Sequence, residues 1–97
     1  MLLLAILTVR RSELDAFRAF EQAAATIMAR HGGRIEQAFV IDEGGDTLRE
    51  LHVVRFASTE ARAHYAADPE LVALAEIRAR CVVHTEILNA TDGPRYG

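Results

Sequence analysis

The segment Glu50–Phe56, ELHVVRF, places two side chains that can do chemistry among apolar residues. It has the pattern of a β-strand, and side chains alternate between the two faces of a strand. His52 and Arg55 are therefore expected on opposite faces. Phe56 is expected to anchor the face that helices cover, together with Val54 and His52. Arg55 is then expected on the uncovered face, where a guanidinium can bind a carboxylate or an enolate bidentately.

Both side chains also have a purely structural interpretation. Arg55 can form an ion pair with Glu36 or Glu86, within the sheet or between subunits, because a buried arginine is usually paired. His52, near the end of a strand, can be partly exposed or hydrogen-bonded in place. Arg55 is the stronger functional candidate of the two, because its face is the one that the helices leave uncovered.

A second group of candidates lies nearer the end of the chain. His84 is expected in the middle of the last strand, with Glu86 two residues later on the same face. A histidine beside a carboxylate can act as a general base, and the alternative is a polar pair at a subunit boundary. Tyr65 is expected on a helix, either as a ligand-binding hydroxyl or as a packing residue with its hydroxyl at the surface.

The remaining patterns predict neither a metal site nor a bound cofactor. The four histidines do not share a helix or strand at metal-ligand spacing, and no phosphate-binding glycine loop follows a strand. Cys81 is the single cysteine, so there is no intrachain disulfide and no cysteine cluster for zinc.

Composition limits the class of protein. The chain has 97 residues, 51% of them hydrophobic, and a formal net charge of −3, which argues against a nucleic-acid binder or an anionic-membrane binder. The N-terminal apolar run, residues 2–9, is too short to span a bilayer. Arg10 and Arg11 follow this run, whereas a signal peptide carries its positive charge before it. We therefore expect a buried strand, and a cytoplasmic protein with a reduced thiol.

The order of elements predicts the fold. Strand patterns cover residues 2–9, 34–41, 47–56 and 82–88. One helix is expected to begin at Ser12, with Asp15 completing a capping box, and to end at Gly32-Gly33. A second is expected to begin at Ser58 and to restart at Asp68-Pro69.

This β-α-β-β-α-β order predicts one ferredoxin-like α+β domain over residues 1–90, followed by a short tail, 91–97. Its four-stranded antiparallel sheet is expected to carry two helices on one face. The first strand would leave apolar side chains on the other face as well, which favours a homodimer packed sheet against sheet.

Three stretches of the sequence resemble a known group. They are ARHGGRI (29–35), VVRFASTEARAHYAADPELVAL (53–74) and VVHTEI (82–87), which together follow nearly the whole chain. They resemble the dimeric α/β-barrel superfamily and, within it, the small bacterial DUF1330-like proteins. The resemblance implies a ferredoxin-like fold and a twofold dimer, and it puts Tyr65 at an aromatic position of the family pattern. Relatives in the superfamily include small monooxygenases, isomerases and haem-handling enzymes.

Three functions remain open from the sequence. The first is an enzyme that binds a small, partly apolar molecule between sheet and helices, for proton transfer or cofactor-independent oxygenation. His84 would be its base, Arg55 its anion clamp, and Tyr65 or His52 an orienting donor. The second is a noncatalytic dimer that binds a small ligand, and the third is a structural domain. Convergence of Arg55, His84 and Glu86 on one pocket would favour the first two.

Overall fold

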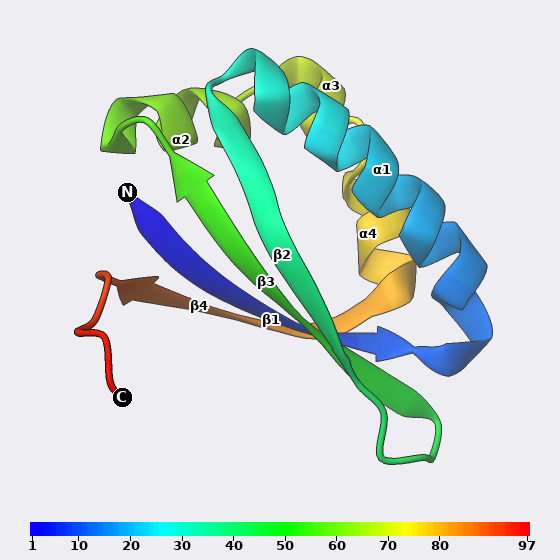
Figure 1. The fold of residues 1–97 in the computed structure, drawn as a ribbon. Coiled ribbons are helices and arrows are strands. Elements are labelled where there is room, and N and C mark those ends of the chain that lie inside the picture. Colours follow the sequence, from blue (N-terminus) through cyan, green and yellow to red (C-terminus); the bar gives the residue numbers. More distant parts are fainter.

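A four-stranded antiparallel sheet carries all the helices of the chain on one face (Figure 1). The computed structural model describes every residue from 1 to 97. The strands are β1 (Leu2–Arg10), β2 (Gly33–Ile41), β3 (Thr47–Phe56) and β4 (Val82–Ala90). The helices are α1 (Leu14–Arg30), α2 (Thr59–Ala66), α3 (Pro69–Val72) and α4 (Ala75–Cys81), with a 3-10 turn, Arg11–Glu13, before α1. The predicted ferredoxin-like α+β fold is confirmed.

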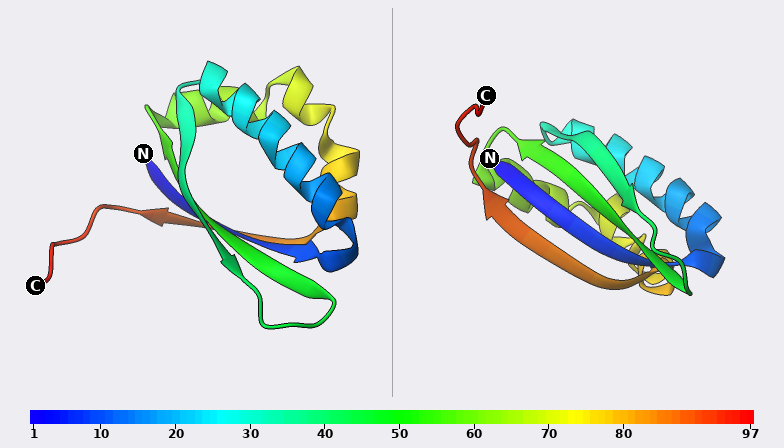
Figure 2. Two further views of the ribbon diagram at one scale, coloured as in Figure 1. Left: turned by 45° about the vertical axis from the view of Figure 1, so that its right-hand side comes forward. Right: turned by 60° about the horizontal axis from the view of Figure 1, so that its bottom comes forward.

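The strand order β2-β3-β1-β4 puts the most apolar strand, β1, inside the sheet. Leu3, Leu7 and Val9 of β1 point to the inner face, the one beneath the helices, and are buried. Leu2 and Leu4 alternate with them and point to the outer face, the one without helices, where they are half-buried. Figure 2 shows the twisted sheet with its outer face free of any helix. An apolar strand in this central position therefore explains why both faces of the sheet are apolar.

The beginning of α1 differs from the expected capping box. Ser12 lies in the 3-10 turn, and no side chain caps α1, which begins at Leu14. The physical reason is the anchoring of Arg11, whose guanidinium bonds to both carboxylate oxygens of Asp42 at 2.9 and 2.6 Å. Its backbone N–H also donates to the carbonyl of Asp46 at 2.9 Å. The turn between β2 and β3 thus fixes this segment before α1 begins.

The other predicted helix boundaries are confirmed. The backbone N–H of Ala61 donates to Ser58 Oγ at 3.0 Å, and that of Glu70 donates to Asp68 Oδ1 at 2.8 Å. The chain leaves α1 at Gly32, whose φ of +70° suits glycine. The expected second helix is divided into three short ones, α2, α3 and α4. None of the helices is long and apolar enough to cross a membrane.

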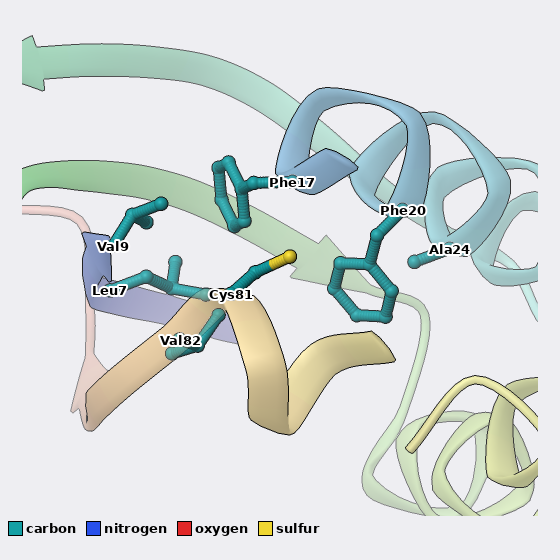
Figure 3. Close-up of a cluster of buried hydrophobic side chains, with 7 residues drawn as sticks. All are labelled: Leu7, Val9, Phe17, Phe20, Ala24, Cys81 and Val82. Atoms are coloured by element: carbon teal, nitrogen blue, oxygen red, sulfur yellow. The ribbon is translucent and has the colours of Figure 1, made fainter. Parts of the chain in front are cut away.

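The core consists of two clusters between the sheet and the helices. The larger cluster holds Leu7, Val9, Phe17, Phe20, Ala24, Cys81 and Val82 (Figure 3). The smaller cluster holds Leu3, Met28, Val54 and Phe56. Cys81 is fully buried among the side chains of the larger cluster, as Figure 3 shows. Residues of both clusters also line the cavity that forms the candidate site.

Candidate functional site

A cavity of about 450 Å³ lies between the inner face of the sheet and the helices, where the sequence predicted a cleft. This volume falls within the range of small-molecule pockets. The lining is mostly apolar and comes from all four helices and all four strands. Its polar members are Glu21, His52, Arg62, Tyr65, Arg78 and Thr85.

His52 lines this cavity and lies within a row of ionisable groups. Its imidazole Nε2 lies 2.8 Å from Glu50 Oε1, and the other oxygen of Glu50 accepts a hydrogen bond from Arg18. Its second ring nitrogen, Nδ1, lies 3.7 Å from Glu21 Oε2. His52 and Glu50 are each only 4% exposed. Arg18, Glu50, His52 and Glu21, hereafter the proton chain, thus run from the surface into the cavity.

The partners of Glu50 determine which imidazole nitrogen carries the hydrogen. Burial acts to raise the pKa of Glu50, but the hydrogen bonds from His52 and Arg18 outweigh it and lower that pKa below its usual value. An ionised carboxylate can only accept hydrogen bonds, so His52 Nε2 must be the donor. In the neutral imidazole, Nδ1 then presents its lone pair toward Glu21 and the cavity, as a general base requires.

The pKa of Glu21 is shifted in the opposite direction, above its usual value. Burial is the main cause that raises the pKa of its carboxyl group, and the charge of Glu50 raises it further, against the opposing effects of His52, Arg78 and Arg18. A carboxyl group with a raised pKa beside an imidazole can take or return a proton. The pair formed by Glu21 and His52 can therefore perform general acid–base chemistry on a molecule in the cavity.

The sequence prediction missed Glu21 and Glu50, although the pattern held a signal for both. Glu21 occupies the apolar stripe of α1, four residues after Phe17 and three before Ala24, and so it faces the sheet. Glu50 precedes His52 by two residues on β3 and shares its inner face. A carboxylate at a core position of a helix or strand is rare without a partner, so each pointed to a buried polar site.

Two of the predicted site residues line the cavity, His52 and Tyr65. Of the two structural alternatives for His52, partial exposure is wrong, because β1 and β2 flank it on both sides, whereas a hydrogen bond that holds it in place is present, to Glu50. Tyr65 lies on α2 with its ring centroid 5.5 Å from that of Phe56. Burial, helped by the charge of Glu21, raises the pKa of the Tyr65 hydroxyl to about 12. The hydroxyl therefore stays protonated and can donate a hydrogen bond.

Arg55 lies on the outer face, as the strand alternation predicted. Its Nε donates to Glu36 Oε1 at 2.5 Å, and its Nη2 donates to Asp92 Oδ1 at 2.6 Å. The ion pair with Glu36 is one of the two that were expected, while Glu86 is not a partner. Asp92 belongs to the C-terminal segment after β4, so Arg55 joins that segment to β2 and β3.

His84 and Glu86 also lie on the outer face, remote from Arg55. His84 pairs in register with Thr8 of β1, whereas Arg55 pairs with Leu2. Six residues of β1 separate these positions, which corresponds to roughly 20 Å along the strand. The structure therefore does not bring Arg55, His84 and Glu86 to one pocket, and none of the three lines the cavity.

The rest of the polar lining consists of two arginines and one threonine. Arg78 of α4 donates through Nη2 to Thr85 Oγ1 of β4 at 2.7 Å, and Arg62 comes from α2. A guanidinium can bind the anionic group of a ligand or of a cofactor. No group of three or more His, Cys, Asp or Glu side chains is arranged to hold a metal ion.

Several solved structures share this fold. A protein of Bacteroides thetaiotaomicron provisionally described as an antibiotic biosynthesis monooxygenase has a TM-score of 0.73 at 18% identity, covering 100% of this chain and 95% of its own. SnoaB of Streptomyces nogalater, a cofactor-independent oxygenase, has a TM-score of 0.66 at 13% identity, with coverage of 95% and 94%. A NIPSNAP domain protein of Burkholderia xenovorans has a TM-score of 0.67 at 15% identity, with coverage of 98% and 100%. At these identities the likeness concerns the fold.

Sequence comparison gives the family. No curated protein matches the chain significantly. The profile of a domain of unknown function, DUF1330, matches residues 3–89, which agrees with the resemblance found in the sequence. Because that match spans most of the chain, the protein belongs to the DUF1330 family.

Proposed function

We propose that the protein is a small-molecule enzyme that removes a proton from, or moves a proton within, a mostly apolar substrate bound in the cavity. The observation that carries this proposal is the proton chain, which ends in the cavity at Glu21 and His52. A buried imidazole held by an ionised carboxylate is a costly arrangement for a purely structural role, since apolar residues would fill the same space at less cost.

Each member of the chain has a part in the reaction. His52 Nδ1 accepts the proton from an acidic C–H or O–H group of the substrate. Glu50 stabilises the imidazolium that results, and Arg18 keeps Glu50 ionised. His52 then returns the proton to another atom of the substrate, which would complete an isomerisation, or passes it to Glu21 through a bridging water, because 3.7 Å is too long for a direct hydrogen bond. The Tyr65 hydroxyl donates a hydrogen bond to the oxygen on which negative charge develops.

Cofactor-independent oxygenation would start with the same proton transfer. Removal of a proton gives a carbanion or enolate, which can donate electrons to molecular oxygen. SnoaB, a cofactor-independent oxygenase, has the same fold, and this supports the oxygenase as one outcome of the proposed step. Arg55, His84 and Glu86 have no part in this reaction, because they lie on the outer face.

The test is hydrogen exchange on a ketone of suitable size. The probe is 2-tetralone, a bicyclic ketone with acidic α-hydrogens, incubated with the protein in D₂O and followed by proton NMR. We expect exchange above the buffer rate, and a loss of about a hundredfold or more in His52→Gln, as removal of a general base typically causes. His64→Gln is the matched control, because His64 is exposed on α2 and does not line the cavity. Equal rates for His52→Gln and the unchanged protein would contradict the proposal.

The same experiment addresses the noncatalytic alternative. Line broadening of the 2-tetralone signals would report binding, and exchange would report chemistry. Binding without exchange above the buffer rate would favour a small-ligand-binding protein over an enzyme.

We also propose that the protein is a homodimer, joined through the outer faces of two sheets. The apolar side chains of this face are Leu2, Leu4, Ile6, Phe39, Ile41, Leu51, Val53 and Leu88. Phe39 is 47% exposed and Leu88 is 42% exposed in the single chain. The face extends over all four strands without a helix to cover it. A second copy suits it because a twofold axis pairs a surface with itself.

Native mass spectrometry tests the dimer. We expect a dimer for the unchanged chain and a monomer for Leu4→Glu, which places a charge at the centre of the outer face. Val72→Lys is the control, because it alters an exposed apolar residue of α3, on the helix side. A monomeric unchanged chain, or a dimeric Leu4→Glu variant, would contradict the proposed interface.

A further inference from the structure

The arginines of this chain divide into two groups. All eleven basic side chains of the sequence are arginines. Seven of them form ion pairs with Asp or Glu: Arg11, Arg18, Arg30, Arg34, Arg49, Arg55 and Arg80. The other four are Arg10, Arg62, Arg78 and Arg95. Arg10 and Arg95 are exposed to solvent, whereas Arg62 and Arg78 are half-buried and both line the cavity.

Arg78 is held in place without being neutralised. Its one side-chain hydrogen bond goes to Thr85, a neutral acceptor on the floor of the cavity. A guanidinium has five N–H groups, so several of them remain available. Arg62 makes neither a side-chain hydrogen bond nor an ion pair with the protein. Both therefore have donors free for a molecule that enters the cavity.

The charges in the cavity do not cancel. Arg62 and Arg78 contribute two positive charges, and the ionisable acid of the lining, Glu21, contributes at most one negative charge. The lining therefore carries a surplus of at least one positive charge in a protein whose net charge is −3. An apolar cavity of this kind attracts an anion, because its low-dielectric walls strengthen the field of the arginines.

We propose that the ligand of this cavity is an apolar organic acid, whose single carboxylate is bound by Arg62 and Arg78 and whose hydrocarbon body packs against the apolar lining. A monoanion matches the surplus of one charge that the lining has when Glu21 is ionised, and a carboxylate matches the planar fork of a guanidinium. Arg78 donates to Thr85 on β4, whereas His52 lies on β3, on the other side of β1, so the body of the acid extends across the sheet toward the proton chain. The inference rests on the proposed function only in taking this cavity as the ligand site.

Isothermal titration calorimetry with two matched probes tests the inference. The acid is 2-naphthylacetate, and its neutral counterpart of nearly equal shape is 2-naphthylacetamide. We expect the acid to bind more tightly, and Arg78→Met or Arg62→Met to weaken its binding by about tenfold to a hundredfold, as expected for the loss of a hydrogen bond between charged groups. The double variant is expected to bind acid and amide equally. Arg95→Met is the control, because it removes the same charge from the exposed tail.

The outcomes separate this inference from the proposed enzyme. Preference for the acid that disappears in the double variant supports the anion site, even if 2-tetralone shows no exchange. Equal binding of acid and amide, or binding of neither, overturns the anion site, even if His52-dependent exchange of 2-tetralone is observed. A loss of acid binding in Arg95→Met equal to that in Arg78→Met would also overturn it, because the effect would then reflect net charge. His52→Gln should retain the preference for the acid.

Discussion

The imidazole Nδ1 of His52 lies 3.7 Å from Glu21 Oε2, a contact between the sheet and α1 inside the cavity. On its other side the same imidazole bonds to Glu50, so it lies between two carboxylates whose pKa values are shifted in opposite directions. Opposed shifts on neighbouring groups are typical of sites that transfer protons. Both shifts also make the stability of the fold depend on pH, and a substitution at each carboxylate can measure its contribution separately.

Glu21→Gln is expected to stabilise the protein increasingly as the pH rises. Burial raises the pKa of Glu21 in the folded state, so folding favours its protonated form. The favourable contribution of Glu21 to stability is complete below the pKa that its carboxyl group has in the unfolded chain. It is lost as the pH rises through the higher pKa that the group has in the folded protein. Urea unfolding measures this between pH 4 and pH 8. The unfolding free energy of the variant should exceed that of the unchanged protein by an amount that increases with pH.

Glu50→Gln is the matched comparison, with the opposite sign. The hydrogen bonds from His52 and Arg18 lower the pKa of Glu50 against the effect of burial. The contribution of Glu50 to stability is therefore present above the pKa that its carboxyl group has in the unfolded chain. It is lost as the pH falls through the lower pKa that the group has in the folded protein. The loss of unfolding free energy in Glu50→Gln, relative to the unchanged protein, should be greatest near neutral pH and should shrink in acid. Parallel pH profiles for the two variants would refute the opposed shifts.

The hydroxyl of Tyr65 is expected to ionise only near pH 12. Its burial beside Glu21 disfavours the phenolate. Tyr96, the only other tyrosine, is 90% exposed, so Tyr96→Phe leaves Tyr65 as the single phenol to follow by ultraviolet absorbance. Adding Glu21→Gln should lower the midpoint, because one of the groups that raise the pKa is then neutral. An unchanged midpoint would show that the carboxylate does not act on this hydroxyl.

Gly33→Ala is expected to destabilise the fold by about 1–3 kcal/mol through overpacking. An added Cβ would lie 2.4 Å from Phe56 Cε1 and 2.6 Å from Met28 Cγ, and both of these side chains are buried. Urea unfolding measures the change. Gly93→Ala is the control, because nothing lies within 4 Å of its Cβ position. Equal stability of the two variants would mean that the core near Gly33 can move apart.

Asp68→Asn is expected to lower stability at neutral pH and to have little effect in strong acid. The hydrogen bond from His31, 2.7 Å long, is the main cause that lowers the pKa of Asp68. The contribution of the carboxylate is present above its unfolded pKa and lost as the pH falls through its folded pKa. Asparagine can still cap α3, so the substitution isolates the pair with His31. A loss of stability in Asp68→Asn that stays the same in acid would show that it does not come from the pair with His31.

Local signals in the sequence were enough to predict most of the fold. Ser58, Asp68-Pro69 and Gly32 act through bonds or backbone angles within a few residues, and the structure uses all three as expected. Ser12 was the exception. Its helix start depends on the bond between Arg11 and Asp42, which lie 31 residues apart, and no local pattern reports such a contact.

The site was less accessible to prediction for the same reason. The alternation of β3 correctly separated His52 from Arg55, and a cleft between sheet and helices was expected, but the predicted base and clamp, His84 and Arg55, do not line the cavity. Glu21 and His52 meet because α1 packs on β3, and Arg55 meets Asp92 only because the last segment turns back toward β3. Each of these contacts requires the three-dimensional arrangement of elements that are distant in the chain.

The proton chain and the two unpaired arginines lie on separate segments of the chain. Arg18, Glu21, Glu50 and His52 come from α1 and β3, whereas Arg62 and Arg78 come from the stretch of short helices between β3 and β4. Tyr65, the proposed hydrogen-bond donor, belongs to the same stretch of short helices. The two proposed anion-binding arginines can therefore change, in evolution or by protein engineering, without altering the four residues of the proton chain, as long as Tyr65 is kept. In the proposed enzyme, this division would allow the preferred acid to change while the proton transfer stays the same.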